Sequence, residues 1–408
     1  MTAFSRTRAT AYLKERWEKD DQILHQLMVN SPILGMMYKD KQAGGRYHHI
    51  PILKSGPQGR SAVHATARTN AVGSNTDGFD VTYGSNYQIA KVDGNLVDDT
   101  KISENAIYEA IDHEMKAAIA NMKKDLRLNV FGNLGGSRGV IGSVSTTDVT
   151  LAYPSQAIHF EVDMEICVSA ADGTSGALRD SGQAVTLAAV DFSNGILTAD
   201  ENWSEISGTT AGDYLFAEGD FGAKWSGLAG WIPVTAPTSG DDFFGVDRSS
   251  NPTRFAGWRY TATGEAIESA FINACAQGHL FDATATIGVV NPVQWGVIAN
   301  SLGADSQNRR IRVKDSSGYI GYDAVMVYTQ MGDVPIVSDP GCPVEYGWVL
   351  DMSTWKVLCV GGDLVRIIDD DGLLIRRAAS GDEWEIEIKA RGNFACTDPS
   401  KNGILSFV

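Results

Sequence analysis

Apolar side chains recur with helical spacing over residues 103–131, the most regular pattern in the chain. The main apolar positions are four residues apart: Ile107, Ile111, Met115 and Ile119. A stripe with this period lies on one face of an α-helix and packs against another element. Ser103 is a suitable N-cap, and Gly132 can end the helix. About 28 residues at ~1.5 Å each predict a rod roughly 40 Å long.

Residues 44–95 show a different pattern, in which short strand-like runs are divided by turn-forming residues. The runs are YHHIPIL, SAVHATA, FDVTY and YQIAKVDG, and the dividers are GPQG, GSNTDG and GSN. This arrangement predicts a long hairpin. Few bulky apolar residues lie between Ser55 and Gly78. Since an isolated hairpin is marginally stable at best, this one must be held by contacts from outside itself. Its exposed edges suit an interface.

The other segments predict a polar arm, a β-rich unit and a mixed body. Leu13, Trp17, Leu24 and Leu27 have near-helical spacing within residues 1–40, and this arm is expected to lie on a neighbouring domain or subunit. Residues 144–235 alternate in short runs, as in a small barrel or sandwich. From about residue 255, helix patterns (AIESAFINACAQG and NPVQWGVIANSLG) are interspersed with strand patterns. EWEIEIKARG (383–392) alternates cleanly and predicts a strand with one apolar face.

Composition excludes several classes of function. The formal net charge is −16 and the pI is about 4.8, whereas tight nucleic-acid binding needs clustered Lys and Arg. Five cysteines are far apart and lack a CxxC pair, which favours single buried thiols in a reducing compartment. The first 22 residues lack the apolar core of a signal peptide, and no apolar run approaches the ~20 residues of a membrane span.

Four short motifs resemble chemical sites, but each lacks a required part. His113-Glu114 begins a zinc-protease pattern in which Ala117 occupies the second histidine position. Ser137 lies in a GxSxG run that follows a helix, the reverse of a nucleophile elbow. The surrounding Gly-rich run (132–143) also lacks the Lys-Ser/Thr of a phosphate loop, so it is interpreted as a turn.

The two remaining motifs could in principle hold a metal. His48 and His49, with His64 nearby, would point to opposite faces of a strand and cannot easily share an ion. Asp369, Asp370 and Asp371 lack the spacing and closing Glu of an EF-hand, and a charged turn is the expected structure. We therefore predict no catalytic, cofactor-binding or metal-binding residues, no cofactor, and a protein that is not an enzyme.

The order of the elements resembles the major capsid proteins of tailed bacteriophages, the Hong Kong 97-like fold family. Local phrases carry the same resemblance: GGRYHHIPI, GRSAVHATA, GDYLFAEGDF, GLAGWIP, FFGVDRSSNPTRFAGWR and VPIVSDPGCP before YGWVLDMSTWKV. The similarity runs from about residue 40 to the C-terminus, and its specificity lies in the combined order of these phrases.

The resemblance implies an α+β capsid fold with six parts. These are an N-terminal arm (1–43), an extended β-hairpin loop (44–100), the spine helix and start of the peripheral domain (101–143), an inserted β-barrel or sandwich (144–236), a mixed α/β axial domain with part of the peripheral domain (237–380), and closing peripheral-domain strands (381–408). Within this scheme 382–394 pairs beside the spine helix, and residues near 264–360 surround the capsomer axes.

The hairpin is the expected interface with other copies. Its basic residues stand out in an acidic chain, and the candidate intersubunit contacts are Arg46, Lys54, Arg60, His64 and Arg68. We expect the cations to pair with acidic patches such as Asp98-Asp99 or Asp382-Glu383. Such pairs are individually weak but add up over a shell. Deleting residues 55–78 should leave a folded body but abolish stable shells. Some relatives cross-link through a loop lysine, but Lys54 has no matching acceptor motif and no cross-link is predicted.

The implied partners follow from the same resemblance. The chain would form pentamers and hexamers with itself in an icosahedral shell, which encloses double-stranded DNA without sequence-specific binding. A separate scaffold, a portal and decoration proteins are expected, with no membrane contact and no trimming of the N-terminus. Assembly would take place in the bacterial host cytoplasm and the protein would end in the virion. The alternatives are an encapsulin-like nanocompartment shell, which holds protein cargo, and a β-rich hydrolase or adhesin with an unrecognised site.

Overall fold

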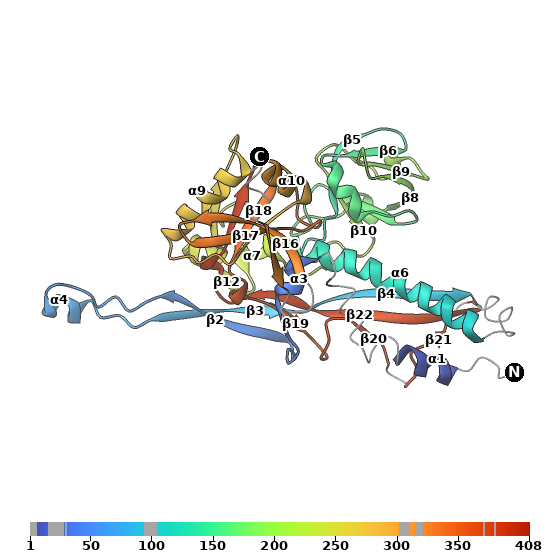
Figure 1. Cartoon of the computed structure of the whole chain (residues 1–408), viewed down its shortest axis with the longest axis horizontal. Coiled ribbons are helices and arrows are strands. Elements are labelled where there is room, and N and C mark those ends of the chain that lie inside the picture. Colours follow the sequence, from blue (N-terminus) through green and yellow to red (C-terminus); the bar gives the residue numbers. More distant parts are fainter. Residues whose placement is uncertain are drawn as a thin grey trace.

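The computed structural model shows an elongated molecule with four parts: a long hairpin, a flat sheet under a long helix, a mixed α/β body and a small barrel (Figure 1). It describes residues 6–14, 28, 31–93, 104–301, 310–314, 321–369, 372–378 and 381–408, without the side chains of 6–9 and 104–109. Within these residues, no helix is long and apolar enough to cross a membrane.

The long helix α6 spans Glu104–Phe131 and confirms the helix predicted from the apolar stripe. Met115 and Leu126 are fully buried on its inner face. It lies against strand β4 (Gly84–Asp93), which pairs with β22 (Glu383–Cys396) over ten registered positions. The Trp384, Ile386 and Ile388 face of β22 points inward, as its alternation predicted, so helix and sheet bury their apolar faces together.

Four more strands complete this sheet on β22 and its neighbours. They are β1 (Tyr38–Asp40), β19 (Trp355–Cys359), β20 (Arg366–Ile367) and β21 (Arg376–Arg377). Short helices flank it, α1 (Arg6–Leu13) near β21 and α3 (Pro32–Met36) before β1.

The mixed body is built on a seven-stranded sheet. Its strand order is β13 (Trp258–Thr261), β23 (Gly403–Ser406), β18 (Tyr346–Leu350), β14 (Ile287–Val290), β17 (Gly332–Ser338), β16 (Gly321–Thr329) and β15 (Arg310–Lys314). Helices α9 (Ile267–His279) and α10 (Pro292–Ser301) pack on it through a core that includes Phe271 and Ile298. Phe131 at the end of α6 contacts Trp348 of β18, with ring centroids 5.4 Å apart, so the long helix is tied to this body.

The last strand, β23, belongs to a different sheet from β22, the strand that precedes it in the chain. We expected 381–408 to form closing strands of one domain, but β23 pairs with β13 and β18 in the seven-stranded sheet. The chain changes sheets at Asn402, which is fully buried. The amide oxygen of Asn402 accepts from Asp351 N and Trp355 Nε1, and its amide nitrogen donates to Thr354 Oγ1. A satisfied buried network of this kind specifies one chain path, which local alternation does not reveal.

Six strands between α6 and the mixed body form a closed barrel in the order β10, β5, β6, β9, β8, β7. Their bounds are β5 Gly139–Val144, β6 Asp148–Leu151, β7 Glu165–Ser169, β8 Ala184–Asp191, β9 Ile196–Ala199 and β10 Tyr214–Ala217. Phe160 and Trp203 fill its core and are fully buried. Closure leaves no free edge strand.

Short connecting elements complete the described structure. They are α7 (Leu228–Trp231), α8 (Pro252–Ala256), the small pair β11 (Asp242–Phe243) and β12 (Val246–Asp247), and 3₁₀ turns at Pro154–His159, Arg179–Gly182, Trp203–Glu205, Arg248–Ser250, Met352–Thr354 and Pro399–Lys401.

Candidate assembly interface

A two-stranded hairpin extends far from the body (Figure 1). Strands β2 (Tyr47–Ser55) and β3 (Asn75–Thr82) pair antiparallel from Tyr47–Thr82 to Ser55–Asn75. No residue from 53 to 78 is buried, and Val63 and Val72 are 59% and 64% exposed. The sequence predicted that this segment has no hydrophobic core of its own, and the exposure of residues 53–78 confirms it. Strand β4, which we had grouped with the loop, belongs to the sheet under α6.

The base of the hairpin is firmly held, in contrast to its tip. Phe79 of β3 is fully buried, and its ring centroid lies 5.0 Å from that of Trp231 and 6.5 Å from that of Phe255. Arg254 Nη1 donates to the carbonyl oxygen of Leu53 at 3.1 Å. Edge-to-face aromatic packing and burial fix the direction in which the hairpin leaves the body.

The tip contains a helix where we predicted a strand. The SAVHATA run was interpreted as strand-like, which is wrong: α4 spans His64–Thr69. The run is exposed and pairs with no other strand, so its Ala-rich local preference decides its conformation. A helix places His64 and Arg68 four residues apart on the same face.

The five predicted contact residues are spread along this projection. Arg46 immediately precedes β2, Lys54 lies at its end, Arg60 lies between β2 and α4, and His64 and Arg68 belong to α4. Within the described residues, none of the five forms an ion pair with the rest of its own chain. They remain predicted contacts between copies.

Two of the acidic residues proposed as their partners already form ion pairs within the chain. Asp382 already pairs with Arg377 at 2.7 Å, and Glu383 pairs with Lys91 at 3.2 Å. Asp98 and Asp99 lie outside the described residues. Pairing of the basic hairpin residues with Asp98 and Asp99 therefore stays a prediction.

The two adjacent histidines of β2 face opposite sides, as expected of a strand. His49 Nδ1 lies 2.7 Å from Asp80 Oδ1, whereas His48 Nε2 lies 2.9 Å from Lys356 Nζ. Burial, together with the Lys356 charge, lowers the pKa of His48. Its neutral ring can thus accept a hydrogen bond from the ammonium.

The described part of the N-terminal arm lies on its own chain. Leu13 is fully buried, Thr10 Oγ1 accepts from Leu374 N at 3.3 Å, and Lys14 Nζ lies 2.6 Å from Asp369 Oδ2. Trp17, Leu24, Leu27, Asp370 and Asp371 lie outside the described residues. Helix α1 and Lys14 of this arm thus contact Leu374 and Asp369 of their own chain. Contact of the arm with another copy stays a prediction.

A closed ring of four charges joins the barrel to α6, and sequence reasoning missed it. Arg138 Nη2 lies 2.6 Å from Asp125 and 2.9 Å from Asp220, and Lys224 Nζ lies 3.2 Å and 2.9 Å from the same two carboxylates. Lys224 also donates to Asn86 of β4. Burial alone would raise the pKa of Asp125, but Arg138 and Lys224 outweigh it and hold this pKa below its usual range.

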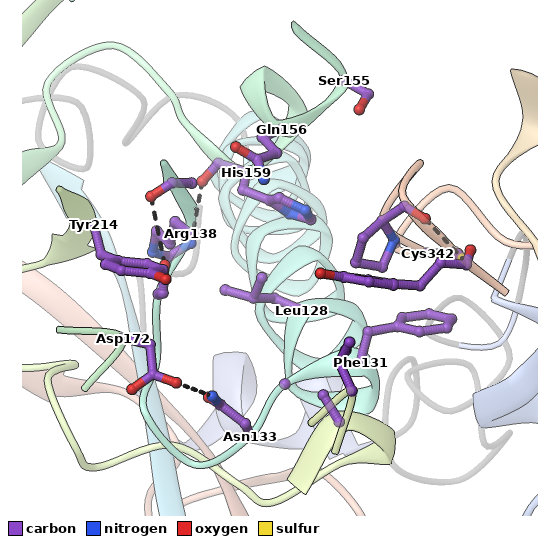
Figure 2. Close-up of a pocket in the computed structure, with 18 of the residues that line it drawn as sticks. Leu128, Phe131, Asn133, Arg138, Ser155, Gln156, His159, Asp172, Tyr214 and Cys342 are labelled. Atoms are coloured by element: carbon purple, nitrogen blue, oxygen red, sulfur yellow. Dashed lines mark hydrogen bonds between the residues drawn. The ribbon is translucent and has the colours of Figure 1, made fainter. Parts of the chain in front are cut away.

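A cleft of about 500 Å³ lies beside this ring, between α6, the barrel and residues 340–346. Figure 2 shows Arg138 and Tyr214 on one side, Cys342 on the other, and His159 between them. Burial, with Arg138 and Arg127 nearby, lowers the pKa of His159 to about 3, so its ring is neutral. Ser137 Oγ donates to the carbonyl of Gly139 and, within the described residues, to no histidine. The GxSxG run is thus part of a turn that positions Arg138.

No family model matches the sequence, and no curated protein matches it. Among solved structures, a chain of the cyanophage A-1(L) capsid asymmetric unit is similar over 92% of each chain, with a TM-score of 0.51 and 12% identity. Mycobacterium phage Bobi gives 0.43 and 11%, over 93% of this chain and 90% of that one. The SrpI encapsulin complex of Synechococcus elongatus gives 0.42 and 7%, over 91% and 84%. The chain therefore has the fold of a phage capsid protein, as its resemblance had indicated.

Proposed function

We propose that this chain is the major capsid protein of a tailed bacteriophage with a Hong Kong 97-like fold, and that its function is self-assembly. Copies would form pentamers and hexamers of an icosahedral shell around double-stranded DNA. The β-barrel would be an insertion into this fold. Scaffold, portal and decoration proteins would be its other partners.

The hairpin is the single observation that carries the proposal. The projection is anchored at its base by buried aromatic rings, but its residues 53–78 are not buried and add no side chain to the core of their own chain. Its backbone edges and its cations are available to a second copy. In a closed assembly every copy gives and receives the same contact, so a weak interface is multiplied.

The test is a shortened hairpin. Ser55 and Asn75 are registered partners, so residues 56–74 can be replaced by a two-residue Asn-Gly turn without altering the paired strands. The base, with Phe79, is retained. This cut is more conservative than removal of 55–78, which would take the start of β3.

Electron microscopy and sedimentation of the purified protein give the readout. We expect uniform shells from the intact chain under assembly conditions, and folded, unassembled subunits from the shortened chain. Normal shells from the shortened chain would refute the role of the hairpin. A monomer that never assembles, even with its phage's scaffold, would refute the proposed function. Protein cargo instead of DNA inside native particles would favour the encapsulin-like alternative.

A further inference from the structure

The negative charge of the chain is concentrated in the barrel. Residues 139–222 contain thirteen Asp and Glu side chains and a single Arg, a formal net charge of −12 out of −16 for the chain. Most of these carboxylates serve the barrel itself. Asp191 accepts hydrogen bonds from Ser193 and Asn194, Asp213 pairs with Arg179, and Asp220 belongs to the charged ring.

Within the described residues, five exposed carboxylates have no such role: Asp163, Glu165, Asp200, Glu205 and Glu218. Glu165 begins β7 and Asp163 lies two residues before it, and both are grouped with Glu218. Glu218 N donates to Glu165 O at 3.0 Å, so these two residues are adjacent. The neighbouring Glu218 side chain, by hydrogen bond and by charge, raises the pKa of Glu165. We call Asp163, Glu165 and Glu218 the acidic rim. Two carboxylates held together favour an incoming cation.

The rim borders an apolar contact point. Val162 is 52% exposed beside a groove of about 250 Å³ that separates the barrel from α6. The groove is lined by Val162, Asp163, Gln88 and Asn121, among others, and its cations Lys124 and Arg138 are already paired with Glu161 and Asp125. A ligand for this surface therefore combines positive charge with a small apolar side chain.

The hairpin tip has these properties. Residues 54–74 contain Lys54, Arg60 and Arg68 and no acidic residue, a formal charge of +3. Val63 and Val72 are exposed beside these cations. In β15, a further basic segment, two of the three cations already have partners: Arg312 lies 3.5 Å from Asp323, and Arg310 lies over the Trp295 ring.

We propose that the acidic rim of one copy receives the hairpin tip of a second copy in the shell. The contact cannot form within one chain, because the hairpin extends away from the side on which the barrel stands (Figure 1). This inference rests on the proposed self-assembly and names the surface that the hairpin binds. Exposed pairs are screened beyond about 8 Å at physiological salt, so the contact should weaken as salt is raised.

A charge exchange tests the pairing. The tip variant carries Arg60→Glu and Arg68→Glu, the rim variant Glu165→Lys and Glu218→Lys, and the third protein carries all four changes. Asp200→Lys with Glu205→Lys is the matched control, since both residues are exposed on the same barrel. Circular dichroism first confirms that each variant is folded.

We expect the tip and rim variants each to reduce shell yield about tenfold or more, which corresponds to about 1.4 kcal/mol, and the control to assemble normally. The fourfold variant should recover shells, because opposite charges again face each other. A rim variant that assembles like the intact chain overturns the inference while leaving self-assembly in place. Failure of the fourfold variant to recover also overturns it. Failure of the unaltered chain to assemble at all refutes the proposed function instead.

A second measurement does not depend on shell yield. Proteins carrying Arg68→Cys and Glu165→Cys are mixed under assembly conditions and oxidised; the five native thiols are all buried. A disulfide-linked dimer formed only in the mixture supports the contact. Its absence from assembled particles contradicts it.

Discussion

Replacement of Arg138 tests whether the charged ring fixes the barrel on α6. Arg138→Met removes the guanidinium and retains a long apolar side chain. Among the described residues, Lys224 is then the one cation that still pairs with Asp125 and Asp220, and the buried ring acquires a net negative charge. Arg138 is 5% exposed, so water cannot easily replace the lost contacts.

The expected loss is large because a buried carboxylate loses its partner. Removing one member of a buried ion pair typically costs about 3–5 kcal/mol, whereas an exposed pair is worth about 0–1 kcal/mol. Arg377, which pairs with Asp382 at 61% exposure of both side chains, gives the matched control. We therefore expect Arg138→Met to lower the free energy of unfolding by about 3 kcal/mol or more, and Arg377→Met by under about 1 kcal/mol.

Urea unfolding of the unassembled subunit measures both values, and limited proteolysis near residues 218–227 reports release of the barrel. Adding Asp220→Asn to Arg138→Met restores a neutral ring and should recover part of the loss. Because the pKa of Asp125 is held below its ordinary value, its contribution is present above that value and disappears as the pH falls below about 4. Equal losses for Arg138→Met and Arg377→Met would refute the reasoning.

Three further changes probe other parts of the molecule. Phe79→Ala should destabilise the chain by about 3–5 kcal/mol in urea unfolding, because it empties the aromatic anchor, whereas Val72→Ala on the exposed tip should change it by under about 0.5 kcal/mol. Burial raises the pKa of Asp339 to about 6, so its own contribution to stability should fall by about 2 kcal/mol as the pH rises from 4 to 6, measured as the difference between the native chain and Asp339→Asn. The lowered pKa of His159, about 3, acts in the opposite direction: its contribution should be lost as the pH falls below about 6.5, measured as the difference between the native chain and His159→Gln in pH-dependent thermal melts.

The sequence predicted the elements whose side chains alternate between a buried and an exposed face. Helix α6 and strand β22 follow their apolar stripes closely, because burial on one side imposes the period. The tip helix α4 was misjudged because nothing packs on it, and short exposed runs carry no such period. The charged ring was missed because Asp125 and Lys224 are 99 residues apart, and sequence does not reveal which charges will be buried together.

The proposed interface is predicted to use elements that are oriented before copies meet. Phe79 and Arg254 fix the hairpin at its base, and the ring around Arg138 fixes the barrel on α6. Holding both surfaces in place lowers the ordering cost of binding, so a few exposed ion pairs and small apolar contacts can suffice. Copies in different positions of a shell need slightly different hairpin directions. The exposed strands between Phe79 and the tip would then bend to provide them, because no packing holds these strands. Loosening the base by Phe79→Ala should therefore impair assembly even though the tip keeps every one of its charges.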